Sequence, residues 1–293
     1  MSSGLTSSGK VTAVRSVTLG VPDLAASTAF YTGIWGLMPV LERGDAVYLR
    51  GTGPYHHVLA LTSHGKPQVL ELDLLADDRA AVDALHRQIA SSAATQITAP
   101  GQRDAPGGGY GFSFVDPDGR RVNILTEDTR HADTAPHPDR PAKITHAVLN
   151  APDMKKISDF YGECLGFTVK GGNPRMFFLQ CNQDHHSLAF AAGNASTLNH
   201  LAFAMQDVAA VSRGAKRMMA HGFPMGWGLG QHAAGEDVYA YFEGPEGGGI
   251  EYITKVPAGW LGSADNTENW DVAVRPTEKQ AAAMRRIPFA LAS

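Results

Sequence analysis

The second half of the chain carries two histidines and a glutamate whose chemistry suits a metal ion. His146 and His200 are 54 residues apart, and Glu251 follows after another 51. Neutral imidazole and ionised carboxylate bind divalent ions of intermediate softness. Two histidines with one carboxylate also leave coordination positions open, as in non-haem Fe(II) sites that use O₂. No cysteine belongs to the trio, which argues against structural zinc.

The competing interpretation is that these residues are ordinary core residues. A histidine in a strand is more often hydrogen-bonded than metal-bound, and the long separations form no compact motif. Glu251, however, lies between Ile250 and Tyr252 in an apolar stretch. A buried charge is costly unless it is paired or metal-bound. We therefore predict that the three side chains converge on a divalent ion.

An internal repeat organises the chain, with an offset of about 130 residues between its two copies. Residues 21–24 (VPDL) match residues 151–154 (APDM), and residues 114–119 (FVDPDG) match residues 242–247 (FEGPEG). The predicted metal ligands fall where the copies differ. The first copy has Ser16, Glu71 and Asn123 at the positions of His146, His200 and Glu251.

Three further side chains near these positions are candidates for catalysis. His232 and Tyr241 have no counterpart in the first copy, which favours a function for them. A histidine near a metal can act as acid or base at neutral pH, and a tyrosine hydroxyl can orient a ligand oxygen. His186 belongs to a His-His pair that recurs as His56-His57, so this pair is also explained by duplication alone.

Each copy has the pattern of an α+β module. A strand, a helix, several strands, a second helix and further strands follow one another, which predicts mixed sheets rather than a parallel βαβ fold. In the second copy, apolar residues at helical spacing predict a helix over residues 157–164, with Asp153 as N-cap and Gly166 at its end. Residues 46–61 and 176–191 are expected to form further β segments.

The repeat also sets the expected domain boundaries. We expect an N-terminal module without metal over residues 1–130, a proline-rich linker over 131–141, a catalytic module over 142–257 and a tail over 258–293. The tail should be a loop that ends in a short helix near residues 278–286. The first ten residues lack the apolar core of a secretory signal.

Composition excludes several classes of protein. Lys and Arg total 25 against 29 for Asp and Glu, so no basic excess predicts a nucleic-acid partner. No apolar run approaches the roughly 18 residues of a membrane span. The two cysteines, Cys164 and Cys181, cannot form a disulfide framework, which predicts a reducing, cytoplasmic location.

The chain resembles the type I extradiol catechol dioxygenases of the vicinal oxygen chelate superfamily over nearly its whole length. The motif residues in the most specific region are Gly230, His232, Tyr241, Pro245, Gly247 and Glu251. Residues 182–190 (NQDHHSLAF) are similar to the paired-histidine strand of the family. Ala240 and Gly244 depart from its usual pattern beside functional positions.

This resemblance implies tandem modules, each of paired βαβββ units that form a curved mixed sheet around a cup. It implies Fe(II), or Mn(II) in the same ligands, held by His146, His200 and Glu251. His186 would be the acid–base residue, with hydrogen bonds from His232 and Tyr241. The implied reaction is extradiol (meta) cleavage of a substituted catechol by O₂, giving a product of the hydroxymuconic semialdehyde type, in a homo-oligomer.

Two alternatives remain open at this point. One is a glyoxalase- or epimerase-like metalloenzyme of the same fold, which would need no O₂. The other is a non-catalytic protein that binds small molecules in its cup. For either enzyme, Phe177 and Trp227, with Met176 and Phe190, are candidate substrate-binding residues, although aromatic residues at such positions equally form cores.

Overall fold

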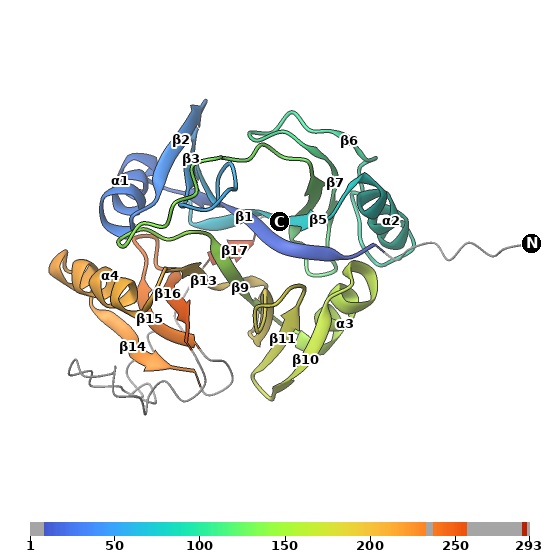
Figure 1. Cartoon of the computed structure of the whole chain (residues 1–293). Coiled ribbons are helices and arrows are strands. Elements are labelled where there is room, and N and C mark those ends of the chain that lie inside the picture. The colour runs from blue at the N-terminus through green and yellow to red at the C-terminus, as the bar shows by residue number, and fades with distance from the viewer. Residues whose placement is uncertain (1–8, 233–236, 257–288, 292–293) are drawn as a thin grey trace, which may run out of the picture.

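The computed structural model describes residues 9–232, 237–256 and 289–291, which form two similar modules (Figure 1). The first contains β1 (Val11–Val21), α1 (Leu24–Ala29), the π-helix η1 (Phe30–Trp35), β2 (Met38–Arg43), β3 (Ala46–Arg50), β4 (Leu59–Ser63), β5 (Gln68–Ala76), α2 (Arg79–Ala90), β6 (Gly101–Gln102), β7 (Tyr110–Val115) and β8 (Arg121–Thr126). The second contains β9 (Ile144–Ala151), α3 (Met154–Leu165), β10 (Thr168–Asn173), β11 (Met176–Gln180), β12 (Leu188–Ala192), β13 (Thr197–Ala204), α4 (Val208–Ala220), β14 (Met225–Gln231), β15 (Asp237–Glu243) and β16 (Gly249–Lys255).

Both modules build the same mixed sheet of eight strands. Its order is β2-β3-β4-β1-β5-β8-β7-β6 in the first module and β10-β11-β12-β9-β13-β16-β15-β14 in the second. The central pairs β1–β5 and β9–β13 are antiparallel, and each is flanked by parallel pairs. Each sheet therefore joins two βαβββ units, and the predicted α+β fold is confirmed.

An aspartate caps the start of each of the four α-helices in the described part of the chain. The carboxylates of Asp23, Asp78, Asp153 and Asp207 each accept a hydrogen bond from the backbone N–H three residues later, at 2.7 to 3.0 Å. This bond satisfies one of the free donors of the first turn. At the other end of α3, Gly166 adopts a left-handed φ of 73°, which glycine tolerates best. Both predicted boundaries of α3 are confirmed.

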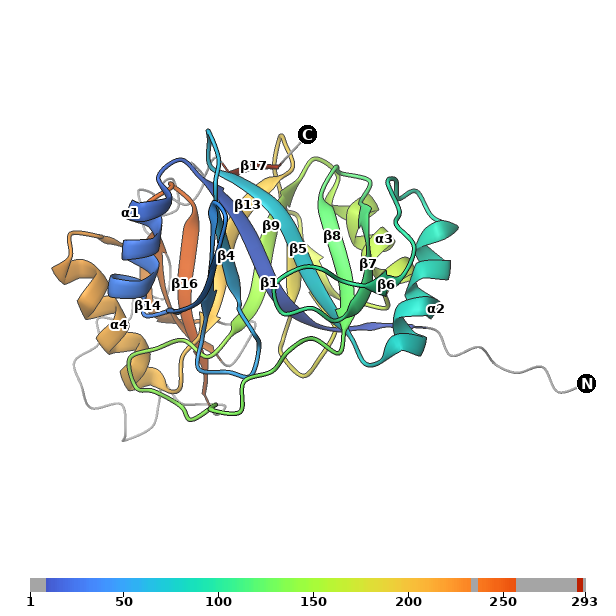
Figure 2. The ribbon, with the colours of Figure 1, turned by 90° about the horizontal axis from the view of Figure 1, so that it is seen from above.

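The helices gather at the two ends of the molecule, with the sheets between them. Figure 2 shows α1 beside α4 at one end and α2 beside α3 at the other. Each end therefore combines one helix from each module. This arrangement places contacts between modules close to the strands that carry the predicted ligands.

One such contact joins η1 to the strand of Glu251. The buried Trp35 ring stacks on Tyr252 with centroids 3.7 Å apart and planes within 7°. The Tyr252 hydroxyl donates to the carbonyl of Trp35 at 2.7 Å, and Arg217 donates to that hydroxyl at 3.1 Å. The residue next to the predicted ligand is thus fixed by the first module.

A polar contact joins the modules at the other end. Arg120 is buried and donates to the backbone carbonyl of Asn150 at 2.8 Å. Arg120 also forms an ion pair with Asp116 at 3.1 Å. The Asp116 carboxylate in turn accepts a hydrogen bond from the Tyr161 hydroxyl of α3 at 3.1 Å. Burial raises the pKa of Asp116, and the guanidinium of Arg120 opposes that rise. Arg120 and Asp116 of the first module thus each form a hydrogen bond to a residue of the second, Asn150 and Tyr161.

A short C-terminal strand, β17 (Phe289–Leu291), bridges the two sheets. It pairs antiparallel with β13 and parallel with β5. The rest of the tail, including the helix predicted near residues 278–286, lies outside the described residues. Within the described ranges, no helix is long and apolar enough to cross a membrane.

Several strands differ from the sequence-based prediction. Residues 46–61 form β3 and most of β4 with a loop between them, and residues 176–191 form β11 and most of β12 in the same way. The second of these loops carries His185 and His186. Strand β14 was not predicted because three glycines interrupt its seven residues, and glycine weakens a strand pattern.

Candidate metal centre

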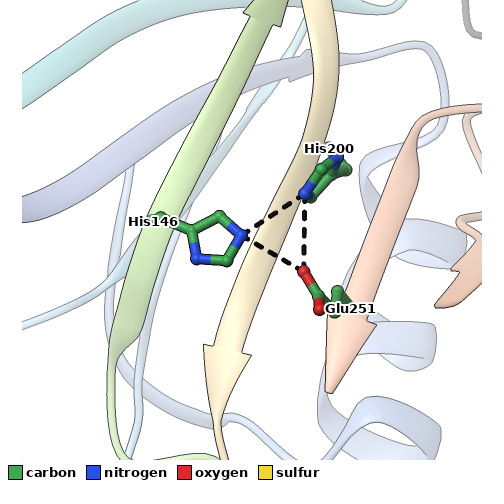
Figure 3. Close-up of side chains that lie close together, drawn as sticks. All are labelled: His146, His200 and Glu251. Atoms are coloured by element: carbon green, nitrogen blue, oxygen red, sulfur yellow. Dashed lines mark hydrogen bonds and ion pairs between the residues drawn. The ribbon is translucent and has the colours of Figure 1, made fainter. Parts of the chain in front are cut away.

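The sheet register brings the three predicted ligands to one face of the second module. Ala202 of β13 pairs with His146 on β9 and with Glu251 on β16. Residues directly opposite one another share a face, and His200 lies two residues before Ala202 on that same face. The small Ala202 side chain leaves space between them. Figure 3 shows the three side chains pointing toward one another from three adjacent strands.

The three groups are buried and very close. His146, His200 and Glu251 are 3%, 4% and 0% exposed. Nε2 of His146 lies 3.4 Å from Nε2 of His200, and Oε2 of Glu251 lies 3.2 and 3.4 Å from these two nitrogens. Among the described residues, this is the one group of three or more His, Cys, Asp or Glu side chains with ligand atoms close enough to share an ion.

The hydrogen bonds of His200 decide which of its nitrogens can bind a metal. Nδ1 lies 2.8 Å from Oδ1 of Asn199, which can only accept, so Nδ1 carries the proton. The Asn199 amide is oriented in turn by donating to Asn150 at 3.0 Å. Burial lowers the pKa of His200, so its imidazole is neutral at pH 7 and Nε2 presents a lone pair. Such outer contacts are typical of metal-bound histidine.

Glu251 presents the matching acceptor. Burial raises its pKa, but the imidazoles of His146, His200 and His232 outweigh that effect and hold the pKa well below the ordinary value. The carboxylate is therefore ionised, yet its buried Oε2 has no hydrogen-bond donor in the described part of the chain. An unpaired buried anion facing a lone pair is unfavourable unless a cation lies between them. The residues fit a divalent metal.

The other predicted site residues surround this centre on two sides. The His186 ring lies 4.1 Å from the His146 ring, centroid to centroid. Burial, with a further contribution from His146, lowers the pKa of His186 well below its ordinary value. Its Nδ1 contacts Nδ1 of His185 at 3.0 Å, which leaves Nε2 as the nitrogen free to exchange a proton with a ligand.

His232 and Tyr241 lie on the opposite side. Nε2 of His232 is 3.1 Å from the Tyr241 hydroxyl and 3.4 Å from Oε1 of Glu251. Tyr241 pairs directly with Glu251 across β15 and β16, and Trp227 pairs with Tyr241 across β14 and β15. The Trp227 and Tyr241 rings stack with centroids 5.0 Å apart. Burial and the charge of Glu251 raise the pKa of Tyr241 well above its ordinary value, so the hydroxyl keeps its proton.

The predicted lining residue Phe177 is not brought to this cluster. It packs against the main hydrophobic core, as does Phe190. The neighbouring Phe178 places its ring 5.0 Å from His186 and 5.3 Å from His185. Successive side chains of a strand face opposite sides, so assigning the faces of β11 would have identified Phe178 instead.

Sequence reasoning missed two further residues here. Asn199 orients His200, but an asparagine beside a histidine carries no recognisable signal. Tyr239 stacks on His232 with centroids 3.9 Å apart. It precedes Tyr241 by two residues on the same strand, so strand alternation could have placed it on this face.

Comparisons with known proteins agree with this architecture. The model of the Glyoxalase/Bleomycin resistance protein/Dioxygenase superfamily matches residues 13–124 and 143–252, once in each module. Metapyrocatechase 2 of Cupriavidus necator is 26% identical over 64% of this chain and 67% of its own length. Biphenyl-2,3-diol 1,2-dioxygenase of Sphingomonas paucimobilis is 24% identical over 81% of this chain and 86% of its own.

Two solved structures are similar in fold. The Mn(II)-bound glyoxalase from Novosphingobium aromaticivorans has a TM-score of 0.81 and 35% identity, over 85% of this chain and 84% of that one. Homoprotocatechuate 2,3-dioxygenase from Brevibacterium fuscum, in its anaerobic complex with 3,4-dihydroxyphenylacetate, has a TM-score of 0.75 and 21% identity, over 87% and 84%. With one family match in each duplicated module, the chain belongs to the Glyoxalase/Bleomycin resistance protein/Dioxygenase superfamily.

Proposed function

We propose that the protein is an extradiol dioxygenase that cleaves a substituted catechol beside its two hydroxyl groups, using Fe(II) and O₂. The observation that carries this proposal is the cluster of two imidazole nitrogens and one unpaired carboxylate oxygen within 3.4 Å of one another. Extradiol dioxygenases among the relatives support the oxygen chemistry. Self-association, expected from the family resemblance, is part of the same proposal.

In this proposal, His146, His200 and Glu251 hold the metal, which when bound acidifies the catechol and brings it together with O₂. The chain's own residues then handle protons and orientation. His186 is neutral at pH 7, so its Nε2 can accept a proton from the substrate and later return it. The Tyr241 hydroxyl, supported by His232, donates a hydrogen bond to a substrate oxygen. Phe178 and Trp227 provide aromatic surface for the ring.

The test is anaerobic loading with Fe(II), and separately with Mn(II), followed by O₂ uptake and absorbance with a panel of monocyclic and bicyclic catechols. We expect uptake with a yellow ring-opened product. The matched control comes from the duplication, because Glu71 occupies the position of His200 in the first module. The His200→Gln variant should lose activity and Glu71→Gln should keep it. A metal-loaded protein that consumes no O₂ with any catechol would refute the proposal.

One observation favours a second candidate, a metal-dependent isomerase of the glyoxalase kind. The solved structure that is 35% identical to this chain is a Mn(II)-bound glyoxalase. Isomerisation needs no O₂, so turnover of a hemithioacetal under strict anaerobiosis would establish this alternative. The proposed oxygen chemistry instead requires that activity disappears without O₂ and returns when O₂ is added.

A further inference from the structure

The loop between β11 and β12 places a carboxylate beside the proposed acid–base histidine. Asp184 lies two residues before His186. Its side chain is 15% exposed, and its two oxygens have different partners. Oδ2 accepts from Lys143 Nζ at 3.1 Å, and Oδ1 pairs with Lys255 Nζ at 2.8 Å. One carboxylate thus binds two ammonium groups that are far apart in sequence.

These two lysines lie at the ends of two strands that carry predicted metal ligands. Lys143 immediately precedes β9 and lies three residues before His146, and Lys255 is the last residue of β16, four residues after Glu251. The ion pairs therefore tie the histidine loop to two of the three ligand strands. Lys255 also donates to the backbone carbonyl of Gln183 at 3.2 Å, which adds a second link to the same loop.

The backbone of the loop is fixed around Asp184 as well. Its N–H donates to Asn182 Oδ1 at 2.8 Å, and its carbonyl accepts from the Gln180 side chain at 2.8 Å. Beyond the histidines, the carbonyl of Ser187 accepts from the N–H of Ala147 at 3.2 Å. Ala147 follows the ligand His146, so the position of His186 relative to the metal centre depends on this loop.

The first module lacks this arrangement although it has the same His-His pair. The positions equivalent to Lys143, Asp184 and Lys255 hold Ala13, Tyr55 and Glu127. Glu127 pairs instead with Arg79 on α2. The corresponding loop is held by Tyr55, which forms a bridge to Arg130 and packs under its guanidinium. Thus the copy with the metal-site residues differs from the other in all three of these positions.

We propose that Asp184, clamped by Lys143 and Lys255, is a positioning residue that sets the distance of His186 from the metal-bound substrate. The inference rests on the proposed function, since it concerns the residue that moves the proton. A single exposed ion pair contributes little to stability, but two pairs on one carboxylate hold a loop whose small displacements would be costly in rate.

The first test compares Asp184→Asn with Asp159→Asn. Asp159 pairs with Lys155 at 2.6 Å on the exposed side of α3, away from the site, and so provides a matched Asp–Lys control. We expect kcat of Asp184→Asn to fall about tenfold while KM changes less than about twofold, because the substrate still binds but the proton transfer is misaligned. Asp184→Glu should recover part of kcat, and Asp159→Asn should match the wild type.

A second readout is independent of turnover. Hydrogen exchange at the amide of Ala147, which donates to Ser187, should be faster in Asp184→Asn and in Lys143→Met than in the wild type, by more than a loss of about 1 kcal/mol in global stability accounts for. Unchanged exchange, or unchanged kcat, in Asp184→Asn would overturn the inference. If the wild type itself cleaves no catechol, the proposed function fails, and exchange alone then decides whether Asp184 positions the loop.

Discussion

The two modules place side chains of different chemistry at the same three positions of the sheet. In the second module, His200 and Glu251 point acceptor atoms at each other beside Nε2 of His146. The first module has Ser16, Glu71 and Asn123 there. Ser16 and Asn123 donate hydrogen bonds to Asp73, and Asn123 also donates to Glu71.

The hydrogen bonds of the first module show how the polar groups at these positions are paired without a metal. Asn123 Nδ2 donates to Asp73 at 2.6 Å and to Glu71 at 3.0 Å, and Ser16 Oγ donates to Asp73 at 2.7 Å. The buried Arg15 guanidinium also donates to Ser16 Oγ at 2.8 Å and lies 3.9 Å from Asp73, so a side-chain cation takes part in this network and no metal is needed. The two modules share the same backbone arrangement. What distinguishes the metal site is therefore a set of hydrogen-bond acceptors that outnumber the side-chain donors beside them.

The largest effect should come from removing an acceptor in the second module. We expect His200→Gln to lower metal content at stoichiometric Mn(II) to background and kcat by at least about 1,000-fold, equivalent to about 4 kcal/mol. Elemental analysis and O₂ uptake measure the two changes. Glu71→Gln at the equivalent position should retain metal. Equal metal loss in both variants would contradict the distinction between the modules.

The next effect concerns stability in the first module. Asp73→Ala removes the acceptor that Ser16 and Asn123 share, and it also removes one carboxylate partner of the buried Arg15. We expect the free energy of unfolding to fall by about 3 kcal/mol. Urea unfolding gives the loss, and titration with Mn(II) should show an unaltered affinity. A destabilisation below about 1 kcal/mol would mean that this network is not needed to keep the first cup folded.

A smaller effect tests the orientation of His200. In Asn199→Ala, Nδ1 of His200 loses its acceptor at 2.8 Å, and the ring is free to rotate or change tautomer. Outer contacts of this kind typically contribute about 10- to 100-fold to metal affinity. Calorimetric titration with Mn(II) would measure the loss. An affinity like that of the wild type would show that the strands alone orient the imidazole.

The smallest effect is the pH dependence of the Asp184 ion pairs. Burial raises the pKa of Asp184, but Lys255 and Lys143 outweigh this and hold it below its ordinary value. A depressed folded-state pKa stabilises the protein above the unfolded pKa, about 3.9, and this contribution is lost as pH falls through the folded pKa.

We therefore expect Asp184→Asn to be up to about 1 kcal/mol less stable than the wild type at pH 7, and the difference to shrink toward pH 3. Urea unfolding at several pH values measures both quantities. A difference that grows on acidification has the wrong sign for these ion pairs.

The sequence was sufficient where periodicity and duplication carry the information. The α+β modules, the ends of α3 and the convergence of His146 with His200 and Glu251 follow from patterns along the chain and from differences between the copies. Which side chains of β11 face the site was harder to predict, because residues 176–179 are all apolar and alternation therefore did not distinguish Phe177 from Phe178. Asn199 and the Asp184 clamp depend on contacts between strands whose register only the structure defines.

The stacked Trp35 and Tyr252 rings bear on how the two copies can be separated or exchanged. Tyr252 is covalently bonded to Glu251, and its ring and hydroxyl are both held by residue 35 of the other copy. An excised C-terminal fragment would lose that anchor beside its carboxylate ligand. Chimeras that import a foreign N-terminal half should therefore preserve an aromatic partner for Tyr252. The N-terminal module has no His-His-Glu trio of its own, but it holds the strand that carries Glu251 in the C-terminal module.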